Sequence, residues 1–210
     1  MPTRSHALLA ALFLASLVAH VAPADAFETY KIVGVAAGDK LTIREEPQEG
    51  GKPTDWAALG SLPADATNVL GTGRSKEVGK QRWSEITVGA VTGWVNARFL
   101  ATADDPVDLK EATFQCAGTE PFWGVTLSPK EGELSDPDSK WKLTTERVQP
   151  AMARFFPLLY RLRNEKGQSL RATVTHQTWC TDGMSEYDYA FQVLLTDDEN
   201  FYEGCCWLKR

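Results

Sequence analysis

The segment 179–189, WCTDGMSEYDY, decides the organisation of the C-terminal half of the chain. It begins with a tryptophan and a cysteine, turns at Asp182 and Gly183, and leads into 190–195, AFQVLL, which has the composition of a β-strand. The chain ends shortly after a second segment with cysteines, 204–207, GCCW. We therefore expect a disulfide to join the loop to the final strand.

The N-terminal segment 1–26 predicts export. Arg4 supplies a positive charge, and 7–19 is an apolar run that is too short to span a bilayer as a stable helix. The sequence ADA at 24–26 has small residues at the two positions that a signal peptidase reads. We expect cleavage there, so that the mature protein begins at Phe27 and is periplasmic or secreted, without stable membrane insertion. A retained membrane anchor is the alternative.

The four cysteines predict two disulfides, because an even number in an exported protein indicates a disulfide framework. Cys205 and Cys206 are adjacent and would point to opposite faces of a strand, so they need different partners. We prefer Cys180–Cys205 with Cys116–Cys206, and the exchanged pairing is the alternative. A zinc site would need four converging ligands, which adjacent cysteines do not readily provide.

Composition and charge set further bounds. The chain has 210 residues, of which 43% are hydrophobic, which fits one or two modest domains. Its net charge is −6, so the surface as a whole should repel nucleic acid and anionic lipid. We therefore expect no nucleic-acid partner.

The two halves of the chain both predict all-β structure. Residues 27–101 consist of short apolar runs broken by turn residues, which is typical of a small barrel. Residues 102–112 contain the acidic, turn-forming DDP and are interpreted as a linker. In 113–210, strand-like runs flank turns at 164–167 and 196–200, which predicts a second antiparallel β-barrel stapled by the disulfides.

Four motifs in the N-terminal unit together resemble a bacterial SH3-like domain. They are LTIR at 41–44, LGSLP at 59–63, WSEI at 83–86 and TGWV at 92–95. The departure from the family is a longer arm at 48–57. The resemblance implies a binding module whose ligand is peptidoglycan or a protein peptide.

The candidate ligand-binding residues of this module are aromatic. Tyr30, Trp56, Trp83 and Trp94 could line a shallow groove, since aromatic side chains give a large contact area at low entropic cost. The alternative is that Trp83 and Trp94 fill the core. Trp56 lies on the longer arm, where exposure is more natural.

Three motifs of the C-terminal unit resemble an uncharacterised family of bacterial envelope proteins related to META/HslJ-like and lysozyme-inhibitor-like barrels. They are GTEPFW at 118–123, CTDGMS at 180–185 and GC at 204–205. The family implies no activity. Cys116 and Cys206 are departures from its pattern and suggest the second disulfide.

The candidate binding residues of the C-terminal unit belong to these motifs. They are Glu120, Trp123, Asp182, Met184 and Glu186. A stapled loop on a rigid barrel is a suitable interaction site, because most of the ordering entropy is lost before binding. The alternative is that Glu120, Trp123 and Asp182 form an internal hydrogen-bonded corner of the barrel.

Catalysis finds little support. After signal removal His176 is the one remaining histidine, and strand alternation places it with Leu170, Ala172 and Val174, as a core residue. A cysteine peptidase needs a thiolate beside a histidine, and a zinc amidase needs about three ligands. We predict no catalytic residue, metal or cofactor.

The sequence thus predicts an exported, non-catalytic binding protein of the bacterial cell envelope. Its SH3-like module would bind peptidoglycan or a peptide, and its barrel would bind an envelope partner. One alternative is an inhibitor of a wall-degrading enzyme such as lysozyme, in which the acidic loop 182–188 enters a basic cleft. Another is a hydrolase that uses the carboxylates of Glu120 or Glu186.

Overall fold

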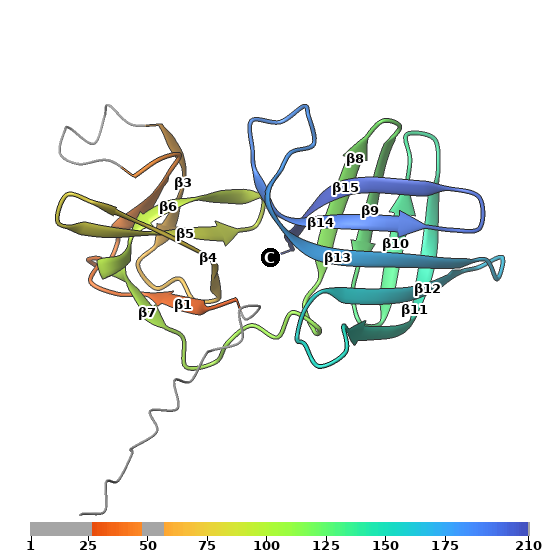
Figure 1. The fold of residues 1–210 in the computed structure, drawn as a ribbon, viewed down its shortest axis with the longest axis horizontal. Helices are drawn as coiled ribbons and strands as arrows, with labels where there is room; N and C mark the ends of the chain where they lie inside the picture. Colours follow the sequence, from red (N-terminus) through yellow and green to blue (C-terminus); the bar gives the residue numbers. More distant parts are fainter. Residues whose placement is uncertain (1–26, 48–56, 210) are drawn as a thin grey trace, which may run out of the picture.

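The computed structural model describes residues 27–47 and 57–209, which form two all-β units (Figure 1). The predicted fold class is therefore confirmed. The predictions for the signal peptide, 1–26, and for Trp56 lie outside the described residues.

The N-terminal unit is one curled sheet, a half-barrel. Its strands are β1 (Thr29–Ile32), β2 (Lys40–Arg44), β3 (Ala58–Pro63), β4 (Val69–Val78), β5 (Gln81–Val88), β6 (Val91–Asn96) and β7 (Leu100–Thr102). The 3-10 helix η2 (Ala97–Phe99) joins β6 to β7. The sheet has seven strands in the order β3-β2-β6-β5-β4-β1-β7, so β3 and β7 are its edges.

Alternation along the strands gives this sheet two distinct faces. In β2, Leu41 and Ile43 are buried in the core, whereas the residues beside them point to the opposite, outer face. In β5 and β6, Ile86 and Val95 belong to the same core. The turn between β5 and β6 is Gly89-Ala90, with Gly89 at φ 57°, and it forms a two-residue hairpin.

The C-terminal unit is a closed barrel. Its strands are β8 (Phe114–Thr119), β9 (Phe122–Leu127), β10 (Glu131–Ser135), β11 (Lys140–Pro150), β12 (Leu158–Asn164), β13 (Ser169–Cys180), β14 (Tyr189–Thr196) and β15 (Phe201–Leu208). The order around the barrel is β10-β11-β12-β13-β14-β15-β8-β9. Every neighbouring pair is consecutive in the sequence except β15 and β8, and their antiparallel pairing closes the barrel.

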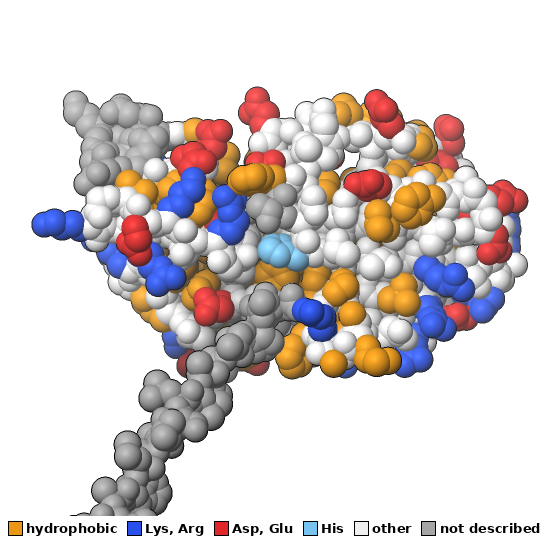
Figure 2. All heavy atoms as spheres, in the orientation of Figure 1, with side chains coloured by type: hydrophobic (Ala, Val, Ile, Leu, Met, Phe, Trp, Pro, Cys, Tyr) orange, Lys and Arg blue, Asp and Glu red, His pale blue; other side chains and the backbone are white. Residues whose placement is uncertain are grey.

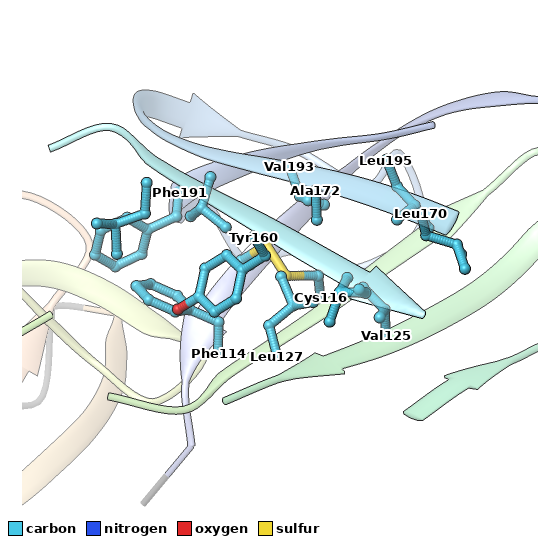
Figure 3. Packing of buried hydrophobic residues seen from close by; sticks show 14 of the residues in the cluster. Phe114, Cys116, Val125, Leu127, Tyr160, Leu170, Ala172, Phe191, Val193 and Leu195 are labelled. Carbon is cyan, nitrogen blue, oxygen red and sulfur yellow. A yellow bond between two sulfur atoms is a disulfide. The ribbon is translucent and has the colours of Figure 1, made fainter. Parts of the chain in front are cut away.

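Apolar side chains fill the barrel interior. Phe114, Tyr160 and Phe191 are fully buried and point toward one another in Figure 3, and the rings of Phe114 and Phe191 lie 5.2 Å apart. At the base of the barrel the ring of Phe27 lies 5.1 Å from that of Phe191, and Leu70 of the N-terminal unit joins the same core. The two units therefore share buried contacts.

The two disulfides are Cys116–Cys206 and Cys180–Cys205, as preferred from the sequence. Cys206 lies inside the barrel directly opposite Cys116 on β8, so this bridge crosses the closing pair of strands. Cys205 belongs to a separate small cluster with Cys180. Because all four cysteines are oxidised, the protein belongs to an oxidising, extracytoplasmic environment. In the described part of the chain, no helix has the length and apolar character needed to cross a membrane.

Replacing Cys116 and Cys206 together by Ala should lower the free energy of unfolding by about 1 kcal/mol more than replacing Cys180 and Cys205 together. The bridges span sequence separations of 90 and 25, and the entropy that a bridge removes from the unfolded chain grows with the closed loop. Urea unfolding measures both variants, and each loss should be about 2–5 kcal/mol. An equal loss, or a larger loss for the shorter loop, would contradict this account.

Candidate functional site

Four hairpin turns surround a cavity at one end of the closed barrel. In an up-and-down barrel every second turn lies at the same end, and here these turns join β8 to β9, β10 to β11, β12 to β13 and β14 to β15. The cavity between them has a volume of about 1010 Å³. We call it the mouth cavity. This volume is at the upper end of the range for small-molecule sites.

Aromatic and aliphatic side chains form the walls of the mouth cavity. The indole of Trp123 is 8% exposed, and its ring lies 5.6 Å from that of Tyr202. Trp141 contributes a second indole, and the buried Leu143 and Leu170 also line the cavity. The hollow is therefore apolar at its inner wall.

Two motif glycines make room for Trp123. A Cβ atom at Gly118 would lie 2.3 Å from the indole Nε1 of Trp123. One at Gly204 would lie 2.3 Å from the carbonyl oxygen of Ala117 and 2.9 Å from the indole Cζ2. The glycines of the GTEPFW and GC motifs therefore leave the space in which the Trp123 indole packs against β8 and β15. Glu120 lies at the rim, in the turn that follows Gly118.

The rim of the mouth cavity is acidic. Six carboxylate side chains line it, against the single cation of Lys166. They are Glu120, Asp136, Asp138, Asp197, Asp198 and Glu199. Partial burial raises the pKa of Asp197, but the hydrogen bonds that it accepts from the N–H groups of Glu199 and Asn200 and from the Asn200 side chain outweigh this, so its pKa is lowered.

A second hollow lies on the outer face of the N-terminal sheet. It has a volume of about 660 Å³ and is lined by Trp83 and Phe99 together with the cations of Lys40, Arg44 and Arg98 and the one carboxylate of Asp39. We call it the sheet cleft. Trp83 is 5% exposed, and within the described residues its Nε1 has no hydrogen-bond partner. Figure 2 shows basic and acidic side chains mixed on the visible face of this unit.

The structure does not bring the aromatic candidates of the N-terminal unit into one groove. Trp94 is buried beneath two cations, with the guanidinium of Arg74 at 5.3 Å and the ammonium of Lys76 at 4.7 Å from the ring centroid. Tyr30 packs against Gly71 and donates a hydrogen bond to Glu28. Its partial burial and then this bond raise the pKa of Tyr30 to about 12. Of the described candidates, Trp83 alone lines the sheet cleft.

Asp182 organises the loop between β13 and β14 from within. Its Oδ1 accepts hydrogen bonds from the N–H groups of Met184 at 3.0 Å and Ser185 at 2.8 Å, and its Oδ2 accepts one from the hydroxyl of Tyr189 at 3.2 Å. The hydroxyl of Thr119 donates to the Asp182 carbonyl at 2.9 Å, which ties the loop to β8. The carboxylate of Asp182 is therefore committed to the loop itself.

The exposed tip of this loop carries the other candidates. Met184 is 67% exposed, and Glu186 is also exposed. Neither residue lines the mouth cavity, whereas Glu120 and Trp123 do. The predicted set thus divides between the mouth cavity and the loop tip, with Asp182 holding the loop together.

The ends of β13 and β14 beside this loop pack against the N-terminal unit, which the sequence does not reveal. The guanidinium of Arg74 lies 4.4 Å from the Trp179 ring and donates to the Glu85 carboxylate at 2.5 Å. Burial raises the pKa of Glu85 more than its bonds from Thr72 and Arg74 lower it. Ala90, from the β5–β6 turn, packs against the outer cluster of Cys180, Tyr189 and Cys205.

The expectation that His176 is a core residue is wrong. His176 pairs with the buried Phe191 and keeps the alternation of Leu170, Ala172 and Val174, but it is the last residue of β13 before the register shifts, and its side chain is exposed there. Its ring contacts that of Phe27 at 4.9 Å, and the partial loss of water there lowers its pKa.

No family model, curated protein or solved structure matches the chain. Within residues 27–47 and 57–209, no three His, Cys, Asp or Glu side chains are grouped as a metal site would need. The mouth cavity, the sheet cleft and the loop between β13 and β14 are therefore the features from which a function can be inferred.

Replacing Gly118 by Ala should lower the free energy of unfolding by about 1–3 kcal/mol, because the new methyl group would overlap the Trp123 indole. Gly124→Ala is the matched control on the neighbouring strand, since its Cβ would meet Ser135 Oγ at 3.3 Å, a tight contact that rotation of the hydroxyl group can relieve. Urea unfolding, followed by tryptophan fluorescence, compares the two. Equal stability of both variants would show that the glycine does not seat Trp123.

Replacing Asp182 by Asn should destabilise the protein at pH 7 by about 1–2 kcal/mol, through weaker hydrogen bonds to the loop. Partial burial raises the pKa of Asp182, but its bonds from Ser185, Met184 and Tyr189 lower it overall. The charged form therefore stabilises the fold above the ordinary pKa of about 3.9, and this contribution is lost as the pH falls through the lowered value.

Urea unfolding of both proteins at pH 7 and at pH 3 measures this effect, and the difference between wild type and Asp182→Asn should shrink at the lower pH. Glu186→Gln removes one exposed charge from the same loop and is the control. A difference that is the same at both pH values would contradict a stabilising carboxylate.

Proposed function

We propose that the protein is an exported, non-catalytic binding protein of the bacterial cell envelope, periplasmic or secreted. Its N-terminal unit acts as an SH3-like module that binds peptidoglycan or a peptide, and its barrel binds a second envelope component. The observation that carries this proposal is the sheet cleft, a ready-made hollow that combines an aromatic wall with clustered cations.

The chemistry of the sheet cleft favours a ligand with carboxylates and a flat or apolar surface. Lys40 and Arg98 are exposed at the cleft, and the guanidinium of Arg98 lies 4.4 Å from the ring of Phe99. Guanidinium and ammonium groups form strong, charge-assisted hydrogen bonds with carboxylates. The stem peptides of peptidoglycan carry free carboxylates, and aromatic side chains pack against sugar and peptide surfaces.

The cleft also fits the motif resemblance of this unit. The WSEI and LTIR motifs supply Trp83 and Arg44, which both line the hollow. The motifs that resemble an SH3-like domain therefore supply side chains to the cleft, and do not only build the sheet. This convergence of motif and hollow supports a binding module over a purely structural unit.

Sedimentation of the mature protein, residues 27–210, with insoluble peptidoglycan tests the proposal. The double variant Lys40→Ser with Arg98→Ser should lower the apparent affinity by about fivefold or more, because two charge-assisted contacts are lost. The matched control, Lys130→Ser with Arg161→Ser, removes the same charge from exposed positions on the barrel and should sediment like wild type. Binding should weaken as salt is added.

The proposal fails if the intact protein does not sediment with peptidoglycan, or if both double variants lose binding equally.

The exposed Met184 and Glu186, on a loop fixed by Asp182 and a disulfide, favour the inhibitor alternative. Stoichiometric inhibition of lysozyme without sedimentation would support that alternative in its place.

A further inference from the structure

We propose that the mouth cavity of the barrel binds a small organic cation with an apolar body. This inference rests on the binding role proposed for the barrel, and it names the chemical class of the ligand. Three features of the cavity carry it: its size, its aromatic wall and the sign of its charges.

The size favours a small molecule. The hollow of about 1010 Å³ lies between four short turns of a closed barrel, below which the interior is filled by buried side chains such as Leu143 and Leu170. A pocket of this kind encloses most of a drug-sized ligand. The cavity wall also has a fixed shape, because Trp123 is wedged over Gly118 and Gly204.

The aromatic wall suits a cation with an apolar part. Trp123, Trp141 and Tyr202 all line the cavity, and Trp123 and Tyr202 pack against each other with an interplanar angle of 51°. The faces of such rings attract ammonium and guanidinium groups, and tryptophan does so most strongly. The aliphatic side chains beside them would pack against the apolar body of the ligand.

The charges at the rim determine the sign of the ligand. Six carboxylates oppose one ammonium, and within the described residues no hydrogen bond or salt bridge engages the side chains of Asp138, Asp198 and Glu199. Asp136 and Asp197 are used in their own turns, where they accept backbone N–H bonds. A cation entering the cavity would be attracted, and an anion of equal size would be repelled.

Three probes of nearly equal shape separate these effects. Benzyltrimethylammonium is a cation, neopentylbenzene is its neutral isostere, and 2,2-dimethyl-3-phenylpropanoate is a related anion. Ligand-detected NMR titrations against the intact mature protein measure their affinities. The cation should bind about tenfold or more tightly than the neutral isostere at low salt, the anion should not bind, and added salt should reduce the advantage of the cation.

Two pairs of variants locate the site. Asp198→Asn with Glu199→Gln should weaken cation binding by about tenfold, because two rim charges are lost. Glu45→Gln with Glu77→Gln removes the same charge from exposed positions of the N-terminal unit and should bind as wild type does. Trp141→Ala should weaken the cation and the neutral probe together, whereas Trp179→Ala, outside the cavity, should weaken neither.

The outcomes distinguish this inference from the function on which it rests. If the neutral isostere binds as tightly as the cation, or the anion binds best, the cation class is overturned while the barrel remains a binding unit. If none of the probes binds, the inference is overturned, whereas binding through the loop tip of the barrel and through the sheet cleft is untouched, because Met184 and Glu186 lie outside the mouth cavity. Binding that is unaffected by Trp141→Ala would place the cation elsewhere and also overturn the inference.

Discussion

The pairing of β15 with β8 is the contact on which the rest of the barrel depends. All other neighbouring strands of the barrel are consecutive in the sequence, so each pair forms with little loss of chain entropy. The closing pair joins segments whose bridged cysteines are 90 residues apart, and it must hold the whole meander in a ring. Cys116 and Cys206 face each other across this pair, so the bridge stabilises the most costly contact of the fold.

The tripeptide at 204–206 ties together three parts of the molecule. Gly204 leaves the space in which Trp123 lies. Cys206 faces inward and closes the ring, whereas Cys205 holds Cys180 and the loop that follows it. Trp179, next to Cys180 at the end of β13, lies against Arg74 of the other unit. Three consecutive residues of β15 therefore determine the closure of the barrel, the shape of its mouth and the contact between the two units.

Alternation explains why much of the fold could be predicted. Successive side chains along a strand point to opposite faces of the sheet. An alternating apolar pattern therefore indicates a strand, and two adjacent cysteines in a strand point to opposite faces. This alternation does not indicate which side chains of other strands and loops cover each face. Trp83 and Trp94 are both buried, yet Trp83 lines the sheet cleft and Trp94 lies under Arg74 and Lys76. His176 follows the alternation and pairs with the buried Phe191, yet it lies at the end of the regular part of β13, where its side chain is exposed.

The mouth cavity could not be predicted residue by residue. Asp136 and Asp197 have the sequence context of ordinary turns, and they do accept turn hydrogen bonds. Their common location appears only when the barrel closes and brings every second turn to the same end. The predicted turns at 164–167 and 196–200 could have been grouped at one end, because alternate turns of a meander share an end, but the strand β10 (Glu131–Ser135) was not predicted.

The two hollows differ in sign, and the net charge of the chain conceals this. The net charge of −6 predicts that the surface as a whole repels nucleic acid and anionic lipid. The sheet cleft nevertheless gathers Lys40, Arg44 and Arg98, while the barrel mouth gathers six carboxylates around Lys166. Screening limits the reach of exposed charges to about 8–10 Å at moderate salt, so a ligand responds to the hollow that it enters more than to the whole surface. The proposed wall ligand and the proposed small cation are therefore assigned to different units of the chain.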